Sequence, residues 1–221
     1  MTLVRIPIDQ RVMLEADLVI PENPVSMVVF SHGSGSSRFS PRNNFVAQQL
    51  QRKGMATLLA DLLTRREDQF YSNRFDILLL SERLIKITQW IRKNKEIEDL
   101  PIGYFGASTG AASALTACAE LGDEIKAIVS RGGRQDLAQI NFQAIVAPTL
   151  LIVGELDADV MTLNQNVYEQ LRCKKKLISI AGATHLFEEP GALEQVATLA
   201  ADWFERFLVK NQKHSLHQHA D

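Results

Sequence analysis

Ser108 lies in the segment Gly106-Ala107-Ser108-Thr109-Gly110, which fits the pattern G-x-S-x-G. The pattern is typical of a serine nucleophile when it joins a strand to a helix, because that sharp turn needs small residues around the serine. The same turn would place Ser108 at a helix N-terminus, where the amide of Thr109 can stabilise a developing oxyanion. A serine that only caps a tightly packed helix is the alternative interpretation.

A serine hydroxyl needs a base, and two of the five histidines lie outside the C-terminal tail. His185, in the segment GATHLFEEPG, follows the last predicted strand, so we expect it at the same edge of a parallel sheet as Ser108. His32 follows an earlier strand and lies in a turn. A structural role is the alternative for either ring, and we predict that His185 is the base.

Three carboxylates, Glu155, Asp157 and Asp159, follow the next-to-last predicted strand in the segment LLIVGELDADV. A carboxylate beside the base would orient the imidazole and stabilise its charged form. Asp157 is the first aspartate past the strand, and its short side chain could reach the His185 loop. We therefore predict Asp157, rather than Asp159, as the acid. Ser108, Asp157 and His185 would all lie at the carboxyl ends of strands, where open α/β sheets bind ligands.

The glycine-rich turn HGSGSS, residues 32–37, lets the backbone approach a substrate closely. We predict that the amide of Ser34 is a second oxyanion donor, paired with that of Thr109. The turn also resembles half of a dinucleotide-binding fingerprint, with Asp61 after the next strand as a ribose acceptor. Arg38 occupies the place of the third small residue, which argues against nucleotide binding.

Arg131 and Arg134 lie in the segment SRGGRQDLA, after a strand at the same expected edge. An arginine there could bind a substrate carboxylate with two hydrogen bonds, and Arg131 is our candidate for that contact. Holding a loop is the more common role of such residues and is the one we favour. Three aromatic residues could line the pocket or belong to the core: Tyr71, Phe75 and Phe187. The sequence contains no segment resembling a large helical cap, so we expect an open site suited to small or flexible acyl groups.

Short apolar runs alternate with segments of helical period from about residue 26 onward. Apolar strands separated by helices predict an α/β fold, with a mostly parallel sheet covered by helices on both faces. Two polar-interrupted strands, 4–8 and 12–21, predict an antiparallel hairpin at the sheet edge. The predicted parallel strands are 27–33, 55–61, 101–106, 125–133, 147–157 and 175–183. The predicted helices are 41–54, 112–122, 160–171 and 190–208, together with a long amphipathic stretch that ends at Trp90.

The chain has 221 residues, of which 46% are hydrophobic and 23% charged, with a formal net charge of −2. This near balance gives no basic face for nucleic acid. No apolar run approaches the roughly 18 residues of a membrane span, and the N-terminal segment lacks the features of a signal peptide. The two cysteines, Cys118 and Cys173, have neither disulfide-framework nor zinc spacing. We therefore expect a cytoplasmic protein that uses no metal and no cofactor.

Length and the absence of a linker predict one domain, residues 1–209. The tail, 210–221, has no apolar periodicity and is predicted to be disordered. His214, His217 and His219 lie in this tail. A metal-binding role would be one interpretation of them, and a solvated polar end is the one we adopt.

Segments spread over nearly the whole chain carry a family resemblance: HGSGSSRFSPRN, LLADLLTRRE, GASTGAASAL, SRGGRQDLA, PTLLIVGELDADV and GATHLFEEPGALE. They are similar to the α/β-hydrolase superfamily, and within it to dienelactone-hydrolase-like proteins, including hydrolase domains sometimes fused to phosphoribosyltransferases. The resemblance implies an eight-stranded sheet and carries the nucleophile to Ser108, the acid to Asp157 and the base to His185. Dienelactone hydrolase itself resembles this chain but has a cysteine nucleophile, so its specificity does not transfer.

Together these residues predict a serine hydrolase of carboxylesterase type, acting on small ester, thioester or lactone substrates through an acyl-enzyme. The expected partner is this small molecule, with no nucleic acid and no membrane. A binding protein that keeps the α/β-hydrolase fold without catalysis is the alternative from a different class, and a nicotinamide-dependent oxidoreductase is a third. The intact set of serine, aspartate and histidine favours the hydrolase.

Overall fold

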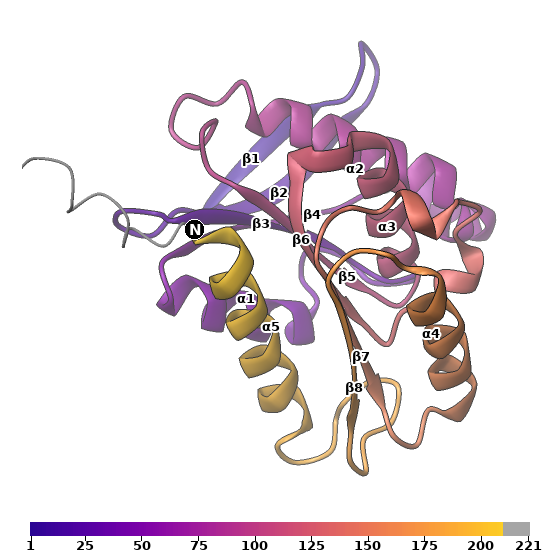
Figure 1. Ribbon diagram of the computed structural model, residues 1–221. Helices are drawn as coiled ribbons and strands as arrows, with labels where there is room; N and C mark the ends of the chain where they lie inside the picture. Colours follow the sequence, from indigo (N-terminus) through magenta and orange to yellow (C-terminus); the bar gives the residue numbers. More distant parts are fainter. Residues whose placement is uncertain (210–221) are drawn as a thin grey trace, which may run out of the picture.

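The computed structural model describes residues 1–209; the predicted disordered tail lies outside the described residues. Its strands form one eight-stranded sheet in the order β1-β2-β4-β3-β5-β6-β7-β8 (Figure 1). Pairings β1–β2 and β2–β4 are antiparallel, and the remaining pairings in the described chain are parallel. The predicted edge hairpin and mostly parallel sheet are confirmed. The strands are β1 Thr2–Pro7, β2 Met13–Val19, β3 Ser26–Ser31, β4 Met55–Ala60, β5 Ile102–Ala107, β6 Ile125–Arg131, β7 Thr149–Gly154 and β8 Lys175–Ile180.

Helices cover both faces of this sheet (Figure 1). Helices α1 (Pro41–Arg52) and α5 (Ala192–Leu208) pack together over one face and enclose one apolar core. On the other face, α2 (Ile77–Ile91), α3 (Thr109–Leu121) and α4 (Ala158–Gln170) enclose a second core. Among the helices of residues 1–209, none combines the length and apolar character of a membrane span. No helical cap domain occurs in this described part of the chain, as predicted.

The local sequence explains why the elements begin where they do. Strands β3, β4, β5 and β7 are buried at every position, as expected for parallel strands with helices on both faces. At the start of α1, the Ser40 hydroxyl accepts a hydrogen bond from the Asn43 amide, and Pro41 fits the first helical position. In the hairpin turn, the Asp9 carboxylate accepts from the amides of Arg11 and Val12.

The segment after β4 differs from the prediction. The sequence favoured one long amphipathic stretch after residue 61, but residues 61–76 form a loop with two short 3₁₀ turns, Glu67–Gln69 and Tyr71–Phe75. Helix α2 starts only at Ile77, where the Asp76 carboxylate accepts from the Leu79 amide at 3.0 Å. The polar residues before Asp76 bind one another and so favour a compact loop over a helix.

Candidate active site

Three side chains meet where strands β5, β7 and β8 end. Ser108 directly follows β5, Asp157 lies in the turn after β7, and His185 lies in the loop between β8 and α5. His185 Nδ1 lies 2.6 Å from Asp157 Oδ2, and His185 Nε2 lies 3.3 Å from Ser108 Oγ. The structure thus brings together the residues that the sequence predicted as nucleophile, acid and base.

The turn that presents Ser108 is held from two sides. The φ of Ser108 is 52° and its ψ is −120°, a region that L-residues rarely adopt. Its amide donates to the Arg131 carbonyl at 3.0 Å, and its carbonyl accepts from the Arg134 amide at 3.1 Å. A Cβ on Gly106 or Gly110 would collide with neighbouring backbone atoms. The small residues of the G-x-S-x-G segment therefore allow the close packing that fixes this turn.

Asp157, rather than Asp159, faces the imidazole. The Asp157 side chain is 14% exposed and that of His185 is 37% exposed, so the bond between them is partly shielded from solvent. Asp159 is exposed at the beginning of α4. Glu155 accepts a hydrogen bond from the Gly182 amide at 2.7 Å and braces the loop after β8. With Asp157 accepting from Nδ1–H, the Nε2 lone pair of His185 faces Ser108.

An open cleft of about 460 Å³ lies in front of these side chains. Besides Ser108, Asp157 and His185, its lining consists of Arg134, Asp159, Val160 and Leu163. The Arg134 guanidinium is bound by two hydrogen bonds of 2.8 Å to the exposed Asp136 carboxylate. The cleft therefore offers a small apolar surface beside charged groups and gives solvent direct access to Ser108.

The two predicted oxyanion donors lie beside the nucleophile. Thr109 starts α3, where helix N–H groups have no carbonyl acceptor within the helix. The Ser34 amide donates to the Thr109 hydroxyl at 2.7 Å. This contact, which sequence reasoning missed, directs the Ser34 N–H toward the residue next to Ser108. A substrate oxyanion would accept from the Ser34 amide, either together with the Thr109 hydroxyl or in its place.

His32, the other candidate base, is bound by backbone groups on both ring nitrogens. Its Nδ1 lies 2.9 Å from the Gly33 carbonyl oxygen, and its Nε2 lies 3.1 Å from the Leu62 amide nitrogen. The structure therefore brings His185, and not His32, to Ser108.

Arg131 does not line the cleft. The residue is 8% exposed, and its Nη1 is buried with no hydrogen-bond partner among the described residues. Ser130 points toward Gln135 on the α3 face, so strand alternation turns Arg131 to the opposite face, where it lies 6.0 Å from the Phe187 ring. Burial, together with the positive charge of Arg42, lowers the pKa of Arg131 to about 10. Arg134, which the sequence also singled out, occupies the position at the cleft.

The three aromatic candidates lie outside the lining of the cleft. Phe187 is 1% exposed and belongs to the core beneath α5. The rings of Tyr71 and Phe75 are tilted against each other, with centroids 5.1 Å apart, and both residues are exposed in the loop after β4. The short 3₁₀ turn that carries both rings, Tyr71–Phe75, contains no buried residue.

A buried polar network supports the turn beneath the nucleophile. The Gln135 amide donates to Ser130 Oγ and to Asn164 Oδ1, both at 2.8 Å, and the Asn164 amide donates to the Gly133 carbonyl at 3.0 Å. All three side chains are fully buried. The network fixes the backbone at Gly133. The next backbone amide, that of Arg134, donates to the Ser108 carbonyl. Asn164 lies between Val160 and Val167 at helical spacing on the buried face of α4. A polar residue at that place in the apolar pattern was the signal in the sequence that could have indicated this network.

The structure gives no support to the nucleotide-binding alternative. Asp61, its ribose acceptor, forms an ion pair with the Arg38 guanidinium and accepts from the Arg38 amide at 2.7 Å. Arg38 also contacts Glu15 and Asp17, so it is enclosed by carboxylates of its own chain. Residues 1–209 contain no cluster of three or more histidine, cysteine, aspartate or glutamate side chains that could hold a metal ion.

Comparison with known proteins places this chain among hydrolases. Residues 44–218 match a family model described as PETase, PET hydrolase-like. Two curated relatives, from Mycobacterium tuberculosis strains CDC 1551 and H37Rv, are each named putative phosphoribosyl transferase. Each is 54% identical over 187 residues, which cover 85% of this chain but 42% of the relative. The chain thus spans less than half the length of these relatives.

Solved structures share the whole fold. Dienelactone hydrolase from Anabaena variabilis superposes with a TM-score of 0.90 at 49% identity, covering 94% of this chain and 97% of that one. Est1E from Butyrivibrio proteoclasticus gives 0.79 at 17% identity, covering 92% and 98%. A lidless α/β serine hydrolase from Xanthomonas campestris gives 0.76 at 18% identity, covering 94% of each chain. The last two similarities establish the fold alone.

Proposed function

The chain belongs to the PET hydrolase-like family of α/β hydrolases, and from this premise we propose that it is a serine hydrolase of carboxylesterase type. The observation that carries the proposal is the continuous contact from Asp157 through His185 to Ser108, at 2.6 and 3.3 Å. A chain of carboxylate, imidazole and hydroxyl is what activates serine for acyl transfer.

In the proposed mechanism, Ser108 Oγ attacks the ester carbonyl carbon while its proton moves to His185 Nε2. The Asp157 carboxylate stabilises the imidazolium that forms. The carbonyl oxygen becomes an oxyanion and accepts hydrogen bonds from the Ser34 and Thr109 amides. The carbon–oxygen bond to the alcohol then breaks, His185 returns the proton to the leaving alcohol, and the acyl group stays on Ser108. Water attacks this acyl-enzyme by the same route and releases the acid.

The open cleft indicates the substrate class. No cap in the described chain forms a tunnel for a long acyl chain, so we propose small esters, lactones or thioesters as substrates. Hydrolysis of p-nitrophenyl esters should be fastest with acetate or butyrate and fall toward palmitate. A rate maximum at long acyl chains would contradict this substrate class. It would not contradict the proposed assignment of the catalytic residues.

Labelling with a fluorophosphonate tests the proposed chemistry directly, because attack on phosphorus uses the same base and oxyanion donors as attack on carbon. We expect one adduct per chain, located on Ser108 by peptide mapping. Ser108→Ala should abolish the adduct, whereas Ser72→Ala, at an exposed serine away from the cleft, should leave labelling unchanged. A folded wild-type chain without an adduct on Ser108 would favour the non-catalytic binding protein.

A further inference from the structure

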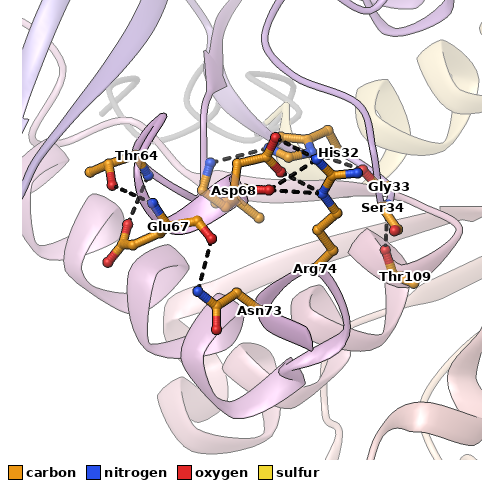
Figure 2. Close-up of polar contacts among 10 residues, drawn as sticks. His32, Gly33, Ser34, Thr64, Glu67, Asp68, Asn73, Arg74 and Thr109 are labelled. Atoms are coloured by element: carbon orange, nitrogen blue, oxygen red, sulfur yellow. Dashed lines mark hydrogen bonds and ion pairs between the residues drawn. The ribbon is translucent and has the colours of Figure 1, made fainter. Parts of the chain in front are cut away.

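The ring of His32 lies between the turn after β3 and the loop after β4 (Figure 2). Its Nε2 lies 3.1 Å from the Leu62 backbone nitrogen, which can only donate, so Nε2 must be the acceptor. In the neutral ring the proton is then on Nδ1, which donates to the Gly33 carbonyl at 2.9 Å. The two backbone partners therefore fix the tautomer of the ring as well as its orientation.

The carbonyl that His32 binds belongs to the same peptide unit as the Ser34 N–H. A trans peptide is planar and points its C=O and N–H in opposite directions, so a hydrogen bond at the oxygen sets the direction of the N–H. That N–H points to the Thr109 hydroxyl, at 2.7 Å, beside the nucleophile (Figure 2). We propose that His32 is a positioning residue, which aims the Ser34 amide at the oxyanion through the Gly33 carbonyl. This role rests on the serine-hydrolase function proposed above.

The loop that supplies the Leu62 amide is itself rigidly bonded. Thr64 and Glu67 bind each other reciprocally, with each backbone amide donating to the other side chain at 2.8 and 3.2 Å. The Arg74 guanidinium holds the Asp68 carboxylate with two bonds of 2.8 and 2.9 Å (Figure 2). His32 thus ties the glycine-rich turn, residues 32–37, to a braced loop, which a positioning role requires.

The environment of His32 keeps the ring neutral. Loss of solvation lowers its pKa, and this effect outweighs the opposing influence of the Gly33 carbonyl and of the Asp61 and Asp68 carboxylates. A protonated ring would present a donor to the Leu62 N–H and lose that bond. A ring locked in this way orients a peptide and takes no proton from the nucleophile.

Two substitutions separate the two hydrogen bonds of His32. In His32→Asn, the side-chain amide can still donate to the Gly33 carbonyl, but nothing reaches Leu62. In His32→Gln, the longer side chain can accept from the Leu62 amide, but the donor to the Gly33 carbonyl is lost. Both variants are compared with the full-length wild type by ester hydrolysis and by the rate of fluorophosphonate labelling, with thermal unfolding recorded for each.

We expect His32→Gln to lower kcat and the maximal labelling rate by about 10- to 100-fold, less than the 10²- to 10³-fold cost of deleting an oxyanion donor. KM and the concentration for half-maximal labelling should change by less than about 3-fold, because only the transition state uses the donor. His32→Asn should retain wild-type kcat within about 3-fold, even if its melting temperature is lower.

The proposed role is overturned if His32→Gln keeps the wild-type kcat, or if His32→Asn loses as much as His32→Gln, since activity would then follow loop stability. Equal labelling of Ser108 in all three chains would overturn the role of His32 and leave the hydrolase function standing. A wild-type chain that is not labelled at Ser108 would overturn both.

Discussion

The turn after β3 and the loop after β8 each place one histidine at the carboxyl edge of the sheet, and the two rings have different hydrogen-bond partners. His185 has a carboxylate on Nδ1 and a serine hydroxyl at Nε2, and its side chain is 37% exposed. His32 has a carbonyl on Nδ1 and an amide at Nε2. A carboxylate can stabilise an imidazolium, whereas a backbone N–H aimed at Nε2 opposes one.

The partners, rather than the histidine itself, therefore distinguish the two rings, and in the proposed mechanism only His185 exchanges a proton with the nucleophile. Asp157 places a carboxylate oxygen 2.6 Å from His185 Nδ1. The backbone partners of His32 fix one neutral tautomer and make the ring a rigid connector between two segments. This difference suggests a graded series of variants, from loss of the base to loss of one hydroxyl group.

The largest effect should come from His185→Ala. Removal of the serine or the histidine from a serine–histidine–aspartate set costs about as much as removal of all three members, roughly 10⁶-fold in kcat. We expect a loss of this order in ester hydrolysis, with a parallel loss in the rate of fluorophosphonate labelling. The matched control is His32→Asn, which should stay within about 3-fold of wild type. Comparable losses of kcat in the two variants would contradict the different roles proposed for the two rings.

Asparagine substitutions test the carboxylate that distinguishes the two rings. Asp157→Asn keeps the shape of the side chain but favours the wrong tautomer of His185, so kcat should fall by about 10⁴-fold. Asp159→Asn, two residues along and also at the cleft, should change kcat by less than about 3-fold. Steady-state kinetics on folded proteins measures both. The assignment is wrong if the second variant loses more activity than the first.

Stability against pH should report the neutral state of His32. Loss of solvation lowers the folded-state pKa of His32 below its ordinary value of 6.5, so the unfolded chain binds this proton at higher pH. The resulting stabilisation is fully present above pH 6.5 and is lost as the pH falls through 6.5 toward the folded-state pKa. Urea unfolding between pH 7.5 and 5 should therefore show a steeper loss for the wild type than for His32→Asn. Identical slopes would mean that folding does not lower the pKa of His32.

The smallest effect should come from Thr109→Val, which removes the hydroxyl that accepts from the Ser34 amide. One lost hydrogen bond should lower the free energy of unfolding by about 1 kcal/mol. The donor remains aimed by His32, so kcat/KM should not fall by more than about 3-fold. Differential scanning calorimetry and ester hydrolysis measure the two quantities. A large loss of activity would show that Thr109, rather than His32, aims the amide.

Much of this site was predictable because it depends on local patterns. Short apolar runs and small residues predicted the strands and the turn at Ser108, and the order of the elements brought Asp157 and His185 to the same edge. The dominant constraint in each case is backbone geometry, which sequence spacing records directly.

The remaining features depend on the directions of individual side chains. Arg131 was expected at the cleft, but alternation along β6 turns it into the interior. The contact between Ser34 and Thr109 joins residues far apart in sequence, and no local pattern encodes it. The loop after β4 was interpreted as part of a helix because apolar period alone does not show that Thr64 and Glu67 bind each other.

The backbone of Ser108 has a consequence for the evolution of the chain. A serine with φ of 52° and ψ of −120° occupies a conformation natural to glycine, at a cost of about 1 to 3 kcal/mol. Under the proposed function, selection for acyl transfer keeps a serine at this position in spite of that cost. In a lineage released from that selection, glycine at this position would relieve the backbone strain and raise the free energy of unfolding. Descendants that have lost the chemistry should therefore be recognisable by a glycine at this position and by a higher melting temperature than their active relatives.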